Sequence, residues 1–190
     1  MLYRLISKSI DYPDAALLAN LQEWRGTLTT QDTDDFSGDE WVVLDQFLSH
    51  LTSQDVTEAQ AAYVQTFDLT PEHALHLTHH LFGDDKNRGP ALIDLTEFYK
   101  EFGLEMRTTA STKAANDEII DDGKSNELPD FLPVILEFAS LLEKEEAHLF
   151  LSRWSKVLNV LAKNLEDAGS PYAPLIRLVE QRSLLVKAAA

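Results

Sequence analysis

Four histidines lie close together in the chain and are the first candidates for chemistry: His73, His76, His79 and His80. On one continuous helix, His73, His76 and His80 would share a face, and histidines four residues apart can bind zinc or nickel. The zinc-protease pattern HExxH is absent. Two interpretations stay open: a metal site on His73, His76 and His80, or a helix that uses these side chains for packing and polar contacts.

Other patterns that carry catalysis are missing. The chain has no GxxxxGK[ST] or GxGxxG phosphate-binding loop and no serine in a GxSxG context. Cysteine is absent, which excludes disulfides, thiol nucleophiles and cysteine-ligated zinc or iron–sulfur centres. Carboxylates are plentiful, but none stands in an evident acid–base pair. We therefore expect a protein without enzymatic activity and without a bound cofactor.

The charge balance limits the partners. There are 32 acidic residues against 16 lysines and arginines, and the formal net charge is -16. Such a surface repels nucleic acid and anionic membranes and attracts basic partners. The excess of acidic residues also has a simpler explanation, solubility or a salt-adapted host. No apolar run approaches the roughly 20 residues needed to cross a bilayer, and the start has no secretory signal. We expect a cytoplasmic protein that does not bind nucleic acid or insert into a membrane.

Hydrophobic periodicity predicts an all-α fold. Apolar residues recur at helical spacing along most of the chain, and no alternating run is long enough for a strand. We expect one domain over residues 1–190, built as a bundle of seven to nine helices. Residues 103–126 are polar and lack a period, which predicts a mobile linker between two helical halves, or a lid. The linker makes a domain-swapped dimer the alternative to a monomer.

Two stretches are richer in polar residues than core packing requires. The histidine stretch, Tyr63–Tyr99, contains Thr70-Pro71-Glu72, a pattern typical of a helix start. It predicts a histidine-rich helix that ends at Gly83, then a charged turn and a second helix. The ELPD stretch, Glu127–Phe138, leads into the most apolar helix, which begins at Pro129 or Pro133.

A peptide site is the function that these stretches favour. The ELPD motif places two carboxylates around a rigid bend beside an apolar helix. A groove there, with an apolar floor and an acidic rim, would suit a peptide that carries hydrophobic and basic residues. Asp68, Glu127 and Asp130 are the candidates for contacts with the basic residues.

Taken together, the two stretches resemble the NarJ family, the delta-type assembly chaperones of respiratory nitrate reductase, which belongs with TorD and DmsD among redox-enzyme maturation chaperones. The matching features are Tyr63, Phe67-Asp68, the segment from His80 to Arg88-Gly89, Asp94-Leu95, Tyr99, Gly103, Glu127-Leu128-Pro129-Asp130 and Leu132-Pro133. They cover about a quarter to a third of the chain, and their occurrence together in this order is fairly specific.

The resemblance implies an all-helical, cytoplasmic, non-enzymatic chaperone. It would bind the N-terminal peptide of a molybdoenzyme catalytic subunit, with the nitrate reductase alpha subunit as the expected client, and hold it for insertion of the molybdenum cofactor. The chain is shorter at its C-terminal end than the nitrate reductase branch, which leaves a related molybdoenzyme open. The candidate peptide-binding residues are Tyr63, Phe67, Asp68, His80, Asp85, Arg88, Tyr99, Glu127, Asp130, Phe131 and Glu137.

Overall fold

A computed structural model describes residues 1–27, 37–83, 85–103 and 127–185 of the chain. Within these ranges the protein is all-α, as its periodicity predicts: it has ten α-helices and no β-strand. Nine of them have eight residues or more, and α5 has six; short π- and 3₁₀-helical turns, η1 and η2, lie before α5. The elements are α1 Leu2–Ser9, α2 Ala15–Thr27, α3 Gly38–Thr52, α4 Val56–Tyr63, η1 Val64–Asp68, η2 Pro71–His73, α5 Leu77–Phe82, α6 Arg88–Glu101, α7 Leu132–Ala139, α8 Lys144–Ser152, α9 Ser155–Asp167 and α10 Ala173–Ser183.

Local capping explains where several helices begin. Ser37 and Glu40 form a reciprocal capping box at the start of α3, each side chain bonding the other residue's backbone N–H. The Asp55 carboxylate accepts a hydrogen bond from the Glu58 N–H at the start of α4. Pro133 stands in the first turn of α7, where proline is tolerated, and this decides between the two expected start positions.

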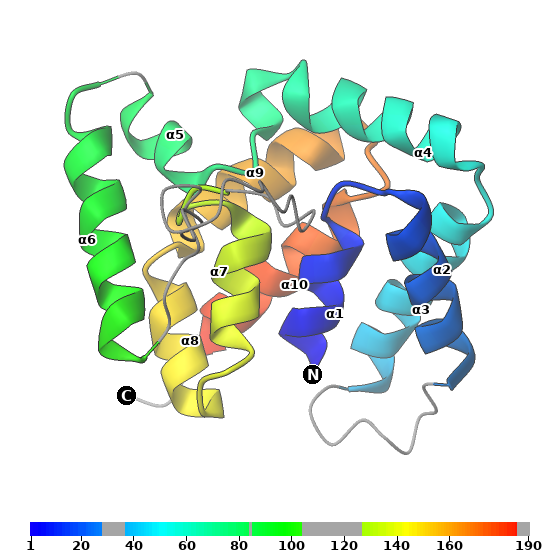
Figure 1. Ribbon diagram of the computed structural model, residues 1–190, viewed down its shortest axis with the longest axis horizontal. Helices are drawn as coiled ribbons and strands as arrows, with labels where there is room; N and C mark the ends of the chain where they lie inside the picture. Colours follow the sequence, from blue (N-terminus) through cyan, green and yellow to red (C-terminus); the bar gives the residue numbers. More distant parts are fainter. Residues whose placement is uncertain (28–36, 84, 104–126, 186–190) are drawn as a thin grey trace, which may run out of the picture.

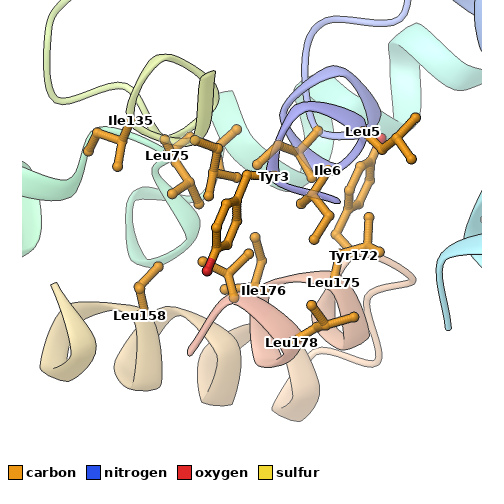
Figure 2. Close-up of a cluster of buried hydrophobic side chains, with 14 of the residues drawn as sticks. Tyr3, Leu5, Ile6, Leu75, Ile135, Leu158, Tyr172, Leu175, Ile176 and Leu178 are labelled. Carbon is orange, nitrogen blue, oxygen red and sulfur yellow. The ribbon is translucent and has the colours of Figure 1, made fainter. Parts of the chain in front are cut away.

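The core is formed by helices from both ends of the chain. α1 packs against α7, while α10 packs against α9, α8 and α3; Figure 1 shows α1 and α10 at the centre of the molecule. Figure 2 shows side chains of these helices pointing into one apolar cluster, which includes Ile6, Ile135, Leu158 and Ile176. α7 is buried almost all round and exposes Glu137, as expected for the most apolar helix.

The described part of the histidine stretch differs from the single helix expected between Thr70 and Gly83. A 3₁₀ turn ends at His73, the backbone is extended at Ala74 and His76, and α5 begins only at Leu77. The reason is tertiary: residues 75–77 pair with the backbone of the ELPD stretch, and local helix propensity cannot anticipate that pairing. Further along, α8 is a helix that periodicity did not predict as a separate element.

α5 and α6 lie together at one edge of the molecule (Figure 1). Tyr99 is the buried residue of α6, whereas Ile93 on the same helix is 63% exposed. Among the described helices, none has both the length and the apolar character needed to cross a membrane. The expected linker at 103–126 lies outside the described residues except for Gly103.

Candidate functional site

The histidine stretch and the ELPD stretch meet through their backbones. His76 and Phe131 form an isolated antiparallel bridge. On one side of it the Leu77 N–H donates to the Asp130 carbonyl at 3.0 Å, and on the other the Leu132 N–H donates to the Leu75 carbonyl at 2.9 Å. The two stretches therefore form one structural unit, although they are separate in the sequence.

Asp130 is the centre of this unit. Its side chain has no exposed surface, and its carboxylate accepts hydrogen bonds from the Thr78 backbone N–H and the Thr78 hydroxyl. His76 Nδ1 lies 3.2 Å from the second carboxylate oxygen. Arg88 completes the network: its Nε donates to Thr78 Oγ1 at 3.1 Å, and its Nη2 lies 3.6 Å from Asp130 Oδ2.

The network keeps the buried Asp130 carboxylate ionised. Burial alone would raise the pKa of Asp130, but the hydrogen bonds from His76 and Thr78 outweigh burial and hold the pKa below its ordinary value. A buried carboxylate with this many donors is stable only while all of them stay in place. The network thus fixes the start of α5 and of α6 relative to the ELPD stretch.

The far end of α6 is fixed to the same bend. The buried Tyr99 hydroxyl donates to the Pro129 carbonyl at 2.8 Å, and burial raises the pKa of Tyr99. His80 on α5 is half-buried; its Nε2 donates to the Ala74 carbonyl at 2.8 Å, and burial lowers the pKa of His80. α6 is therefore attached to the ELPD stretch through Arg88 in its first turn and Tyr99 in its last.

The structure brings together some of the predicted site residues. Within one unit lie His80, Arg88, Tyr99, Asp130 and Phe131. The Asp85 side chain is exposed in the turn before α6 and accepts the Asn87 N–H. Glu137 is exposed on α7, 3.7 Å from Lys8 Nζ on α1.

Tyr63 and Phe67 belong to a different part of the molecule. Both are buried, and their rings pack against each other and against Tyr172 just before α10. Their place in an aromatic core cluster accounts for their helical spacing. Asp68, one residue beyond Phe67, is exposed at the end of η1, and Glu127 is partly buried at the start of the ELPD stretch.

The expected acidic rim needs a correction at Asp130. Its carboxylate faces inward because its hydrogen-bond donors, on His76, Thr78 and Arg88, come from the histidine stretch. A client cannot reach a side chain with no exposed surface, so the direct contact expected at Asp130 does not fit this structure. The Asp130 carboxylate instead holds the two stretches together. Contacts of a peptide with the other predicted residues stay predictions.

The histidines do not form a metal site. His73 lies in η2, His76 in extended backbone and His80 in α5, so the shared helix face does not exist. The ring of the buried His73 lies between the Thr66 and Asn164 carbonyls, at 3.1 and 3.2 Å. Within the part of the chain that the structure describes, no three histidine or carboxylate side chains are grouped to hold a metal ion.

A groove lies beside the Asp130 network and shares Thr78 with it. Thr78, which bonds Asp130, is at its wall, and the groove runs between α5, α6 and the junction of α8 with α9. Its volume is about 270 Å³, and its lining is mostly apolar: Leu81, Phe82, Ala91, Leu95, Phe98, Phe150 and Trp154, with the charged side chains of Asp94 and Arg153. Leu81 is 53% exposed there.

None of the candidate peptide-binding residues named from the sequence is among the described lining residues of this groove. Ala91, Leu95 and Phe98 form an apolar stripe, which by itself indicates core packing rather than a ligand surface. Arg153 lies 5.1 Å from the centre of the Phe98 ring, a cation–π contact across 55 positions of the chain (153 minus 98). No local pattern could have joined Arg153 and Trp154 to α6, because they come from a different helix junction.

Comparison with known proteins shows the family to which this chain belongs. The family described as "Nitrate reductase delta subunit" matches residues 31–177, and the chain belongs to that family. The nitrate reductase molybdenum cofactor assembly chaperone NarJ of Escherichia coli K12 is 31% identical over 175 residues, which cover 92% of this chain and 66% of the relative. The chain thus spans just under two thirds of that relative's length.

Two further relatives are similar to this chain over most of its length. The probable nitrate reductase molybdenum cofactor assembly chaperone NarJ of Bacillus subtilis is 26% identical over 177 residues, 93% of this chain and 85% of the relative. The nitrate reductase-like protein NarX of Mycobacterium tuberculosis is 28% identical over 179 residues, 94% of this chain and 24% of the relative. The expected membership of the NarJ family is confirmed.

Proposed function

We propose that this protein is a non-enzymatic, cytoplasmic assembly chaperone that binds the N-terminal peptide of a molybdoenzyme catalytic subunit. The expected client is the alpha subunit of a respiratory nitrate reductase, held while its molybdenum cofactor is inserted. The printed names of the relatives in Escherichia coli and Bacillus subtilis support the chaperone role. The observation that carries the peptide-binding step is the apolar groove between α5, α6 and the α8–α9 junction.

The groove has the composition of a peptide site. Aromatic walls from Phe82, Phe98 and Trp154 offer large contact area to an apolar side chain or to the apolar face of a short helix. Its back wall is held by the Asp130 network, so the site is supported before a peptide arrives. Such preorganisation lowers the entropy cost of binding.

The charge of the molecule favours a basic peptide. The groove itself is lined by one carboxylate, Asp94, and one guanidinium, Arg153, so the preference for a basic segment comes from the formal charge of -16, which attracts such segments from a distance. A peptide with apolar residues for the groove and basic residues for its surroundings would use both features. The sequence predicts the same kind of peptide but expects its groove beside the ELPD stretch, which contributes no described lining residue here.

Calorimetric titration with the N-terminal peptide of a nitrate reductase alpha subunit tests the proposal. We expect saturable binding with a Kd of tens of micromolar or tighter, roughly the range of a modest peptide site. Ala91→Trp fills the groove with an indole and should weaken binding at least about tenfold. Ala19→Trp, an equal change on the exposed face of α2, should leave the affinity unchanged.

Two results would contradict this function. One is the absence of heat at peptide concentrations well above 100 micromolar, where a site of about that affinity should fill. The other is equal affinity for the Ala91→Trp and Ala19→Trp variants, which would separate peptide binding from the groove.

A further inference from the structure

A second cavity lies at the start of α1. It is bounded by α1, the end of α2 and the turn after α7; Figure 1 shows this end of α1 between α7 and the α2–α3 pair. Its volume is about 540 Å³, within the range of ligand sites. It shares no described lining residue with the groove beside α6.

Arg4 gives this cavity its charge. It is the one charged side chain among the described lining residues. Four other arginines in the described ranges, Arg25, Arg88, Arg177 and Arg182, each lie within 4 Å of a carboxylate, while Arg153 lies over the Phe98 ring. Arg4 forms no ion pair with any described residue, in a molecule whose formal charge is -16. α1 also begins here without an acidic residue in its first turn, so the positive end of the helix dipole adds to the Arg4 charge.

The two hydroxyls of the cavity are acceptors. Ser140 Oγ donates its hydrogen to the Glu137 carbonyl at 2.7 Å. Thr27 Oγ1 faces the Glu23 and Trp24 carbonyls at 3.2 and 3.1 Å, so its hydrogen is also used within its own helix. A hydroxyl has a single hydrogen. Toward the cavity these groups therefore offer only lone pairs, and a matching occupant brings N–H groups.

The remaining walls are apolar. Leu5 and the partly buried Trp24 line the cavity from α1 and α2, and Leu141, 63% exposed, lines it from the turn after α7. An occupant that covers Leu141 and Trp24 removes apolar surface from water, which favours association. The cavity thus combines one guanidinium, two acceptors and an apolar wall.

We propose that this cavity is a second binding site, which takes an acidic peptide segment with a glutamate or aspartate between large apolar side chains. The carboxylate pairs with Arg4, since guanidinium and carboxylate match in a two-point geometry. Peptide N–H groups donate to Ser140 and Thr27, and apolar side chains lie on Trp24 and Leu141. The site prefers an acidic segment, whereas the proposed client peptide is basic, and the proposal stands independently of the chaperone function above.

A nuclear magnetic resonance titration of ¹⁵N-labelled protein tests the site. The probes are acetyl-Leu-Glu-Leu-amide and its charge-reversed partner, acetyl-Leu-Lys-Leu-amide. The Glu peptide should shift the Trp24 indole N–H and the Ser140 and Leu141 amides in the millimolar range. Trp24→Phe assigns the indole signal. Arg4→Gln should weaken binding of the Glu peptide about threefold and leave the Lys peptide unchanged, since exposed pairs contribute modestly. Lys163→Gln, which removes one positive charge from the exposed face of α9, is the matched control.

Three outcomes would overturn the proposal. The first is equal binding of the Glu and Lys peptides, and the second is a set of shifts centred on α5 and α6 instead of α1. The third is a response of Trp24 to guanosine monophosphate without any response to the Glu peptide, which would make the cavity a site for small anions. Unchanged affinity in Arg4→Gln would exclude the charge pairing on which the proposal depends.

Discussion

At Asp130, a carboxylate with no exposed surface accepts hydrogen bonds from residues 52 and 54 positions away in the chain. Such a group is stable only when its donors are all in place, and removing one member of a buried charged network is strongly destabilising. The Asp130 side chain therefore holds the histidine stretch and the ELPD stretch together. Its buried carboxylate is not exposed for direct contact with a client.

Replacing this carboxylate by an amide tests that role. Asp130→Asn keeps the size of the side chain but turns an NH₂ group toward donors, and we expect a loss of about 3 kcal/mol in the free energy of unfolding. Urea denaturation measures it. Asp167→Asn, an exposed change at the end of α9, should stay within about 0.5 kcal/mol of the parent. An Asp130→Asn variant as stable as the parent protein would contradict this structural role of Asp130.

The pH dependence of the Asp130 contribution has a definite sign. The pKa of Asp130 in the folded protein lies below its ordinary value, so the carboxylate stabilises the fold above the unfolded pKa of about 3.9. That stability is lost as pH falls through the lower, folded pKa. The difference in unfolding free energy between the parent and Asp130→Asn should shrink as pH falls below about 4. A difference that grew below about pH 4 would contradict this sign.

At the scale of elements, α6 is the helix whose position defines the groove. It packs on α5 and is fixed to the ELPD stretch through Arg88 and Tyr99. Its outer face exposes Ile93. A helix held at its two ends, with little burial between them, is suited to present a wall of a binding site.

Removing one attachment of α6 should loosen that wall. Tyr99→Phe deletes the hydrogen bond to the Pro129 carbonyl and should lower the free energy of unfolding by about 1 kcal/mol. Amide hydrogen exchange at residues 128–131 should become faster. Tyr12→Phe is the matched control, because the Tyr12 ring is 45% exposed. Identical exchange in the two variants would show that the Tyr99 hydroxyl does not hold the bend.

Local patterns predicted the helices well and the site only in part. Periodicity and capping depend on neighbours along the chain, so the all-α fold is predicted correctly and α7 begins at Leu132, one residue before Pro133, one of its two expected starts. The break at His76 and the inward direction of Asp130 depend on pairing between distant stretches, which periodicity cannot reveal. The groove itself needs residues from separate elements, such as Leu95 and Trp154, whose spacing in sequence carries no signal.

At the scale of the whole molecule, the excess of negative charge acts on any basic client. Asp68 and Glu127 are the predicted acidic contacts that do not belong to the Asp130 network, and Asp68 is fully on the surface. Reversing both to lysine should weaken binding of the basic client peptide. The effect should be larger at low salt, because exposed charges are screened at higher ionic strength.

A control with the same change in net charge separates local contacts from the overall field. Glu23→Lys with Asp167→Lys makes the same reversal at exposed positions on α2 and α9. Calorimetry at low salt and at about 0.5 M salt compares the two double variants; at the higher concentration the screening length is only a few ångströms. Equal weakening in both would assign the attraction to net charge rather than to Asp68 and Glu127.

Hydrogen–deuterium exchange with and without the client's N-terminal peptide tests the central claim most directly, because it reports where the peptide binds on the intact chain. We predict slower exchange of backbone amides in α5, α6 and residues 150–154 when the peptide is bound, with little change in α2 and α3. Saturating peptide that leaves exchange in α5 and α6 unchanged would contradict the claim that this groove captures the client.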